Sequence, residues 1–288
     1  GMTTPDPVLL QAQFRKFVSA GITHCAIEAS SIGIAEQRLA GTRIQLAILT
    51  NFTQDHLDYH GSMAAYWQAK EALFAWPELE AAVINVDDAQ GVKLAADLSQ
   101  GRLAGLQAQA IDLWTCSSRG QNARLQACNV KRTLSGLAFD VVEGLHSVHL
   151  QTELMGDYNV DNLLGVIAAL RALKYNLAEI VHVCAHLKAV PGRMEKVAGV
   201  DGIELPLTVV DYAHTPDAVT QTLMALKPVA DAMGSQLWCV LGCGGDRDAS
   251  KRPLMAAAAE SVADQLVLTS DNPRSELPEQ IVRDMQQG

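Results

Sequence analysis

The amino-acid sequence predicts an α/β protein of two domains, each built on a mainly parallel sheet. The chain of 288 residues has room for about two domains of ordinary size. Short apolar runs alternate with helix-like stretches, which is the βαβ pattern of parallel sheets. Between residues 107 and 151 shorter alternating segments replace this pattern and indicate a small antiparallel sheet at the edge. Val190-Pro191-Gly192 breaks the regular structure, so we place the domains at 1–191 and 192–288.

The elements of the first domain follow from the spacing of apolar residues. Helices are predicted where apolar residues recur on one helical face, namely at 7–20, 63–74, 160–174 and 177–187. Buried strands are predicted where short apolar runs occur, namely at 22–29, 46–50 and 81–86. Antiparallel edge strands are predicted at 134–142 and 146–150.

The second domain repeats the alternation of strands and helices. The predicted strands are 207–212, 237–241 and 265–269, and the predicted helices are 217–226 and 253–262. Polar motifs, Gly242–Asp248 and Asp271–Arg274, follow the last two strands. Open α/β sheets bind ligands in the crevice outside the carboxyl ends of their strands. Arginines and acids arriving there predict a small ligand with both acidic and basic groups, such as an amino acid.

Composition excludes several classes of function. The net charge is -10 and no cluster of Lys and Arg occurs, which argues against a nucleic-acid partner. No apolar run approaches the roughly 20 residues that cross a bilayer, so we expect no membrane span. The six cysteines are scattered, as is typical of reduced thiols in a cytoplasmic protein. Cys239 and Cys243 lack neighbouring ligands for zinc.

Possible metal ligands gather after the strand predicted at 46–50. Two His and two Asp occur between residues 55 and 60, and such a loop could bind a divalent metal or a phosphate-bound magnesium. A polar helix cap with exposed histidines explains the same residues. Glu28 favours the functional interpretation, because a carboxylate after an apolar run is costly unless it is paired or bound to a metal. Lys70 lies on an otherwise apolar helix, where a lysine that extends its amine to water is the simpler interpretation.

A phosphate-binding loop of the Gly-Lys-Ser/Thr type is absent from the sequence. None of the nine lysines follows a glycine. If the protein binds a nucleotide, this chain must therefore contact it through other residues.

Nine ordered motifs resemble the Mur ligases of peptidoglycan synthesis, and among them the ligases that add meso-diaminopimelate. They are Thr3-Thr4-Pro5-Asp6, Glu28-Ala29-Ser30-Ser31, Thr50-Asn51 with Asp55-His56-Leu57-Asp58-Tyr59-His60-Gly61, Lys70, Gly156-Asp157-Tyr158-Asn159, Pro191-Gly192-Arg193-Met194-Glu195, Asp211-Tyr212-Ala213-His214-Thr215-Pro216-Asp217, Gly242-Cys243-Gly244-Gly245-Asp246-Arg247-Asp248 and Asp271-Asn272-Pro273-Arg274. The resemblance covers essentially the whole chain. It implies the family's central ATP-binding α/β domain, with a mostly parallel sheet and a small antiparallel sheet. Part of a Rossmann-like C-terminal α/β domain follows.

The resemblance also implies a reaction and its partners. The family forms an amide with ATP and Mg²⁺, through an acyl phosphate and with release of ADP. The substrates implied here are UDP-N-acetylmuramoyl-L-alanyl-D-glutamate (UDP-MurNAc-L-Ala-D-Glu) and meso-diaminopimelate. The resemblance further implies a cytoplasmic monomer without a nucleic-acid or membrane partner.

The family's site residues carry over to matching positions. Those matching the UDP-muramoyl-dipeptide site are Thr3, Thr4, Ser30 and Arg38. Those matching the magnesium and catalytic site are Glu28, His56 and Lys70, the last as a carbamylated lysine. Those matching the adenosine-nucleotide site are Asn162, Arg193 and Asp211. Those matching the diaminopimelate site are Arg247, Asp271, Asn272, Pro273 and Arg274, and Arg274 argues against a lysine-adding ligase.

The sequence also departs from the family pattern. The family's phosphate loop normally precedes the motif that begins here at Thr3, and the chain ends soon after Arg274. We therefore expect an internal fragment that neither hydrolyses ATP nor forms the amide on its own. Ile32 and Glu36 replace residues common in relatives, and Glu36 adds negative charge where the nucleotide-sugar would bind.

Several alternatives stay open at the level of the sequence. One is a lysine-adding or folylpolyglutamate-type ligase of the same superfamily. Another is a binding module that keeps the fold without the reaction. A metal-dependent hydrolase built on His56, Asp58 and His60 is the third, although it would leave Lys70 and the Asp271–Arg274 loop without a role.

Overall fold

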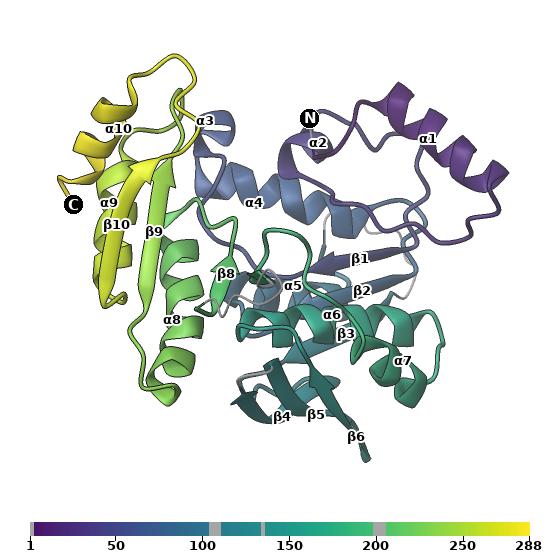
Figure 1. Cartoon of the computed structure of the whole chain (residues 1–288). Coiled ribbons are helices and arrows are strands. Elements are labelled where there is room, and N and C mark those ends of the chain that lie inside the picture. Colours follow the sequence, from purple (N-terminus) through teal and green to yellow (C-terminus); the bar gives the residue numbers. More distant parts are fainter. Residues whose placement is uncertain (1–2, 104–110, 134–135, 198–205) are drawn as a thin grey trace. The chain divides into compact units, whose positions relative to one another are not determined.

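The computed structural model describes residues 3–103, 111–133, 136–197 and 206–288 (Figure 1). The start of the strand predicted at 134–142 and the side chain of Asp58 lie outside the described residues. The chain forms two compact units. The first comprises Gly1–Cys128, Val141–Val148 and Asp161–Val181, and the second comprises Asn129–Asp140, His149–Val160 and His182–Gly288.

A six-stranded sheet follows the order of the chain. Its strands are β1 (Leu46–Leu49), β2 (Ala81–Asn85), β3 (Asp112–Ser117), β4 (Leu125–Thr133), β5 (Gly136–Glu143) and β6 (His146–Thr152). Strands β1 to β4 pair in parallel. Two residues join β5 to its neighbour β6, and so short a connection requires the two strands to run antiparallel. The predicted fold class is confirmed, although β3 and β4, both within the stretch 107–151 predicted to be antiparallel, pair with each other in parallel.

Seven helices of the described chain precede residue 190. They are α1 (Pro7–Ser19), α2 (Ser31–Ala35), α3 (Leu57–His60), α4 (Met63–Glu71), α5 (Ala89–Ser99), α6 (Tyr158–Ala172) and α7 (Leu177–Cys184). Side-chain caps set where four of them begin, because Asp6, Ser30, Ser62 and Asp88 accept hydrogen bonds from free N–H groups of the first turn. One hydrophobic cluster packs β1 and β2 against α5 and the 3₁₀ turn Ala72–Ala75, around Phe74 and Leu94.

The strand predicted at 22–29 is wrong. Residues 22–29 are irregular, and Ile22 and Ile27 are 45% and 40% exposed. β1 stands at the edge of the sheet, and no described strand pairs with this segment. An apolar run predicts burial only where a neighbouring strand supplies the hydrogen bonds and the packing surface, which the run itself does not reveal.

After α7, the described residues form two small sheets and three helices. β7 (Glu195–Val197) pairs antiparallel with β8 (Thr208–Val210), and β9 (Trp238–Cys243) pairs in parallel with β10 (Gln265–Ser270). The helices are α8 (Pro216–Ala232), α9 (Lys251–Glu260) and α10 (Pro278–Met285). They cover one face of the β9–β10 sheet, where Leu241 packs against Met255 and Ile281. α8 continues through Pro228, so the predicted end at residue 226 was too early.

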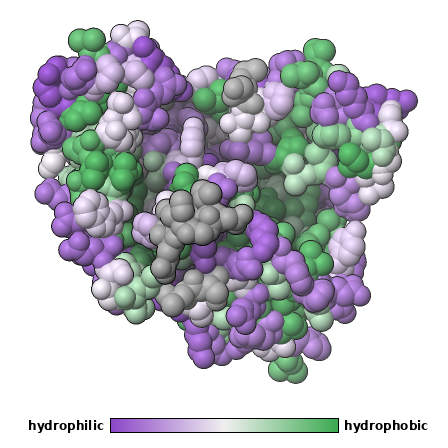
Figure 2. All heavy atoms as spheres, viewed as in Figure 1, coloured by the Kyte–Doolittle hydropathy of each residue, from purple (hydrophilic) through white to green (hydrophobic). Residues whose placement is uncertain are grey.

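Hydrophilic and hydrophobic residues are interspersed on the face of the molecule drawn in Figure 2. Scattered exposed apolar side chains are ordinary for globular proteins. Among the described helices, none is long and apolar enough to cross a membrane.

Candidate functional site

The first group of predicted residues lies beyond the carboxyl end of β1. Hydrogen bonds with polar residues at and just after the end of β2 hold the loop that follows β1. The Asn85 side chain donates to the carbonyl of Thr50 at 2.8 Å, and Asp88 accepts from the backbone N–H of Phe52, also at 2.8 Å. His56 then takes a left-handed conformation with φ 52° as α3 begins. The loop that carries His56 is therefore fixed from the neighbouring strand.

Tyr66 of α4 is the centre of this group, and its side chain is buried. The rings of His56 and Phe52 lie 6.2 and 4.9 Å from its ring, and the Lys70 amine lies 5.3 Å from the ring centroid. Burial raises the pKa of Tyr66 to about 12, and the charge of Asp55 acts in the same direction. The Tyr66 hydroxyl therefore stays uncharged, and the Tyr66 ring packs near residues predicted to bind a metal.

Lys70 has an unusual environment for a lysine. Burial lowers the pKa of its amine, while the charges of Glu28 and Asp55 act in the opposite direction. Partial burial of Lys70 favours the functional interpretation over a lysine that extends its amine to water, and the role of Lys70 stays a prediction. Lys70 lies close enough to Glu28 to interact with its charge. The Lys70 amine and the His56 ring both lie near the ring of Tyr66.

Among the described residues, no three His, Cys, Asp or Glu side chains converge to hold a metal ion. His60 instead contacts the hydroxyl of Ser31 at 2.9 Å and lies against Tyr66. The hydrolase alternative therefore gains no support from the described residues. Glu28 and His56 would need a third ligand of another kind.

A second group surrounds the buried side chain of Thr4. Its hydroxyl donates to the backbone carbonyl of Glu28 at 2.8 Å and accepts from the backbone N–H of Ser30 at 3.0 Å. Arg38 donates to the carbonyl of Thr4 at 3.2 Å. Three of the four residues predicted to hold the nucleotide-sugar therefore lie together, and Thr4 links them to Glu28. Thr3 is exposed at the start of the described chain.

Glu36 takes part in this second group. Its carboxylate accepts from the Arg38 guanidinium, with the Nε at 3.0 Å, and pairs with it as an ion pair. Tyr59 donates to the same carboxylate at 3.4 Å. The negative charge of Glu36 is thus paired with the positive charge of Arg38.

Asn162 is exposed on α6, next to a network that the sequence analysis missed. Ser118 donates to Asp161 at 2.5 Å, and Asp87 accepts from the Ser117 hydroxyl and the Ser118 N–H, both at 2.7 Å. This network ties the ends of β2 and β3 to the first half of α6. A serine at the end of a strand and another just after it gave no sequence signal for this network.

Two predicted nucleotide residues lie close together in the second unit. Asp211 accepts from the backbone N–H of Met194 at 2.9 Å and from Thr222 at 3.1 Å. The Arg193 guanidinium lies 4.9 Å from the ring of Tyr212, in cation–π geometry. Burial and then Asp211 raise the pKa of Tyr158, whereas Arg193 opposes them, so all these groups share one region.

The remaining predicted residues occupy two loops that follow β9 and β10, residues 244–250 and 271–277, which we call the arginine loops. The Gly245 N–H donates to the carbonyl of Asn272 at 2.9 Å, and Arg274 donates to the carbonyl of Gly245 at 2.5 Å. A Cβ on Gly245 would lie 1.9 Å from the carbonyl oxygen of Pro273, so only glycine permits this approach. The loops therefore form one unit, and both arginines remain exposed.

Arg247 differs from Arg274 in having no hydrogen bond or ion pair with any described residue. Asp271 and Asn272 are exposed in the second loop, and Pro273 is partly buried against Gly245. An exposed guanidinium at the carboxyl end of a parallel strand is available to bind a carboxylate.

Arg252 is the functional candidate that sequence reasoning missed. It is only 3% exposed, and it forms ion pairs with Glu276 and Asp284. The available signal was an arginine in the first turn of a helix, where a positive charge opposes the helix dipole.

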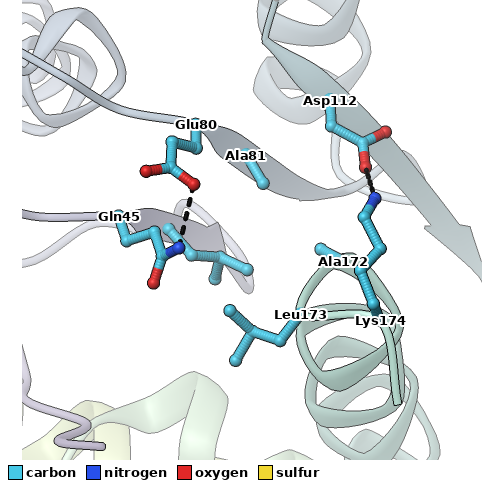
Figure 3. A pocket seen from close by; sticks show the side chains of 8 residues that line it. Gln45, Glu80, Ala81, Asp112, Ala172, Leu173 and Lys174 are labelled. Carbon is cyan, nitrogen blue, oxygen red and sulfur yellow. Dashed lines mark hydrogen bonds and ion pairs between the residues drawn. The ribbon is translucent and has the colours of Figure 1, made fainter.

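A cavity of about 140 Å³ lies elsewhere in the first unit (Figure 3). It is lined by the first residues of β1, β2 and β3 and by residues at the end of α6. Gln45 donates to Glu80 at 2.8 Å and Lys174 to Asp112 at 3.2 Å, so its charged groups satisfy one another. It contains none of the predicted site residues and lies at the opposite strand ends from His56.

Comparison with known proteins identifies the family. Residues 1–170 match the Mur ligase middle domain, and residues 192–288 match the Mur ligase glutamate ligase domain. The UDP-N-acetylmuramoyl-L-alanyl-D-glutamate--2,6-diaminopimelate ligase of Acidovorax sp. (strain JS42) is 59% identical over 98% of this chain and 54% of its own length. The chain thus spans about half the length of the curated relatives that it matches.

Solved structures agree with this result. A structure of UDP-N-acetylmuramoyl-L-alanyl-D-glutamate--2,6-diaminopimelate ligase superimposes with a TM-score of 0.71 at 38% identity, over 99% of this chain and 56% of that chain. Folylpolyglutamate synthase from Thermotoga maritima shares the fold, with a TM-score of 0.61 at 15% identity over 84% of this chain and 51% of that chain. The matched family domains together span most of the sequence, and the chain belongs to the Mur ligase family.

Proposed function

We propose that this chain supplies central and C-terminal catalytic parts of an ATP-dependent, ADP-forming ligase that joins meso-diaminopimelate to UDP-MurNAc-L-Ala-D-Glu. The environment of Lys70 carries the proposal, because burial lowers the pKa of an amine that lies near a carboxylate. The 59% identity to a relative named for this reaction supports the choice of substrates. The matched ranges 1–170 and 192–288 support a division into domains at 1–191 and 192–288.

Magnesium and ATP belong to the same proposal. Mg²⁺ prefers oxygen ligands. Glu28 would supply a carboxylate, and Lys70 would supply a second one after its neutral amine reacts with CO₂ to form a carbamate, while His56 completes the set. The bound ion would neutralise charge on the transferring phosphoryl group.

Other residues of the chain would bind and orient the nucleotide-sugar and the nucleotide. Thr4, Ser30 and Arg38 would orient the nucleotide-sugar, so that its D-glutamyl carboxylate faces the phosphate. Arg193, Asp211 and Asn162 are each proposed as contacts of the nucleotide. The side chains proposed for these roles are either exposed to solvent or fixed by hydrogen bonds, which supports the assignment.

The arginine loops would bind the incoming amino acid. Arg247 has no partner among the residues that the structure describes, and Arg274 keeps donors beyond the one held by Gly245. A guanidinium can grip a carboxylate through two parallel hydrogen bonds, which favours meso-diaminopimelate over lysine because only the former has a distal carboxylate. Asp271 and Asn272 would contact its amines.

A chimera tests the proposed function. This chain replaces the matching segment of the Acidovorax relative, and ADP release is measured with UDP-MurNAc-L-Ala-D-Glu plus meso-diaminopimelate or lysine. We expect turnover with meso-diaminopimelate, and a loss of at least about 100-fold in Lys70→Ala, because the variant lacks a group that stabilises transferring charge. Lys93→Ala, on the exposed face of α5, is the matched control and keeps full turnover. Turnover with lysine instead, or an active Lys70→Ala enzyme, would contradict the proposal.

A further inference from the structure

Arg252 occupies a position that is costly for an arginine. It is the second residue of α9, where its positive charge opposes the helix dipole, and its side chain is 3% exposed. A buried charge is tolerated only when it is paired and hydrogen-bonded. Two carboxylates meet this need: Glu276 at 2.8 Å and Asp284 at 2.7 Å.

These two carboxylates differ in what else they touch. Asp284 lies on α10 and, besides Arg252, accepts from Gln280 at 2.8 Å on the same helix. Glu276 belongs to the second arginine loop and also accepts from the backbone N–H of Asp246, in the first arginine loop, at 2.6 Å. One Glu276 oxygen therefore joins Arg252 to both loops.

Further contacts extend this connection. Asp246 accepts from the hydroxyl of Ser275 at 2.5 Å and from its N–H at 3.2 Å. Arg252 reaches the carbonyl of Gly244 at 3.5 Å, at the start of the first loop. The two loops that carry Arg247 and Arg274 are thus both connected to the same buried guanidinium, through one or two hydrogen bonds.

We propose that Arg252 is a positioning residue that sets the relative placement of Arg247 and Arg274 for the amino-acid substrate. This inference rests on the proposed function. A substrate with two separated charged groups is recognised only if its partners keep a fixed spacing, because misplacing a binding group by about 1 Å can cost about 100-fold. Arg252 itself is too buried to touch the substrate.

The two carboxylate partners provide a matched pair of variants. Glu276→Gln and Asp284→Asn each weaken one ion pair of Arg252 without changing side-chain size, and the carboxylates are similarly exposed, at 30% and 24%. In the chimera with the Acidovorax relative, we expect Glu276→Gln to raise the KM for meso-diaminopimelate about tenfold. The KM for ATP should not change, and Asp284→Asn should leave both KM values within about twofold, although both variants lower Tm similarly.

Arg252→Lys completes the set, because an ammonium keeps the charge but cannot hold two carboxylates and a carbonyl in one plane. We expect it to behave as Glu276→Gln does. Equal KM changes in the two carboxylate variants, or changes in KM for ATP as large as those for meso-diaminopimelate, would show a merely structural role and overturn the inference.

Hydrogen exchange separates this inference from the proposed function. In the 288-residue chain without substrates, we expect the amide of Gly245, bonded to Asn272 across the loops, to exchange at least about tenfold faster in Glu276→Gln than in Asp284→Asn. If the unmodified chimera forms no amide, the proposed function fails, while faster exchange still supports the role of Arg252. Equal exchange in both variants overturns that role whatever the chimera does.

Discussion

At the scale of single residues, Lys70 combines the clearest chemical signal with the clearest test. Burial lowers the pKa of its amine, so the neutral form that attacks CO₂ is present at a lower pH than for an exposed lysine. The attack forms an N–C bond and releases a proton, which Glu28 or Asp55 is close enough to influence.

We predict a carbamate on Lys70. In ¹³C-bicarbonate at about pH 8, the chain should show a carbamate NMR signal that is absent from Lys70→Arg and retained in Lys93→Arg. Because the reaction consumes the neutral amine, the signal should grow as the pH rises from about 6 to 8. A signal that survives in Lys70→Arg would assign the carbamate elsewhere.

The residues around Lys70 show what the sequence reveals about a site. Glu28 and His56 stand out in the sequence because polar groups after apolar runs are conspicuous and match family motifs, and their role as metal ligands stays a prediction. Tyr66 was not, because an aromatic residue on a helix is ordinarily part of the core, and only the structure shows the rings of His56 and Phe52 around it. Arg252 was missed for a related reason, since its partners lie 24 and 32 residues away.

At the scale of elements, the glycines between β9 and α9 serve the approach of two loops. Gly245 is predicted to be the most sensitive of them, because a Cβ there would lie 1.9 Å from the Pro273 carbonyl. Gly245→Ala must push the loops apart, and overpacking of this kind costs about 1–3 kcal/mol. Urea unfolding should show that loss, and in the chimera the KM for meso-diaminopimelate should rise.

Gly165→Ala is the control for this prediction. Its Cβ would meet only Ile48, at 3.7 Å, in the middle of α6. Alanine is favoured over glycine in helices by about 1 kcal/mol, so this variant should unfold at a higher urea concentration. If both alanines had the same effect, the tight approach of the loops would not be the cause.

Elements were predictable to different degrees. The helix at 7–20 and the strand at 81–86 were confirmed because capping and apolar spacing agree locally. α5 was missed because Gly91 lies in its first turns and resembles a turn residue. The glycine is needed there because a Cβ would meet the Asn85 carbonyl oxygen at 2.0 Å. The error at 22–29 shows the opposite case, in which an apolar run has no partner strand among the described residues.

At the scale of the whole molecule, charge determines how stability depends on pH. Several carboxyl groups have a pKa below the ordinary value. Hydrogen bonds from Arg252 lower that of Glu276 and of Asp284, and those from Lys227 lower that of Asp264. For Asp112, burial acts in the opposite direction, but the hydrogen bonds of Arg124 and other donors outweigh it and lower the pKa to about 2.

The sign of the effect follows from linkage. A carboxyl group whose pKa is lower in the folded chain stabilises it above the ordinary pKa of about 4, and this contribution is lost as the pH falls toward the folded pKa. The net charge of -10 acts differently, because self-repulsion weakens as the pH falls from 7 toward the isoelectric point of about 5.2. The two effects together place the maximum of stability between about pH 5 and 6.

We therefore predict that Tm, measured by calorimetry, rises slightly from pH 7 to about pH 5.5 and falls steeply between about pH 4 and 2.5. In 1 M NaCl the fall should be shallower, because the ion pairs of Lys227 and Arg124 are partly exposed and salt screens them, whereas the pairs of the buried Arg252 are screened less. Asp112→Asn should lose part of the acid dependence, since it removes a group whose pKa of about 2 lies below the ordinary range. A Tm that stays constant down to pH 3 would mean that these carboxylates are paired equally well in the unfolded chain.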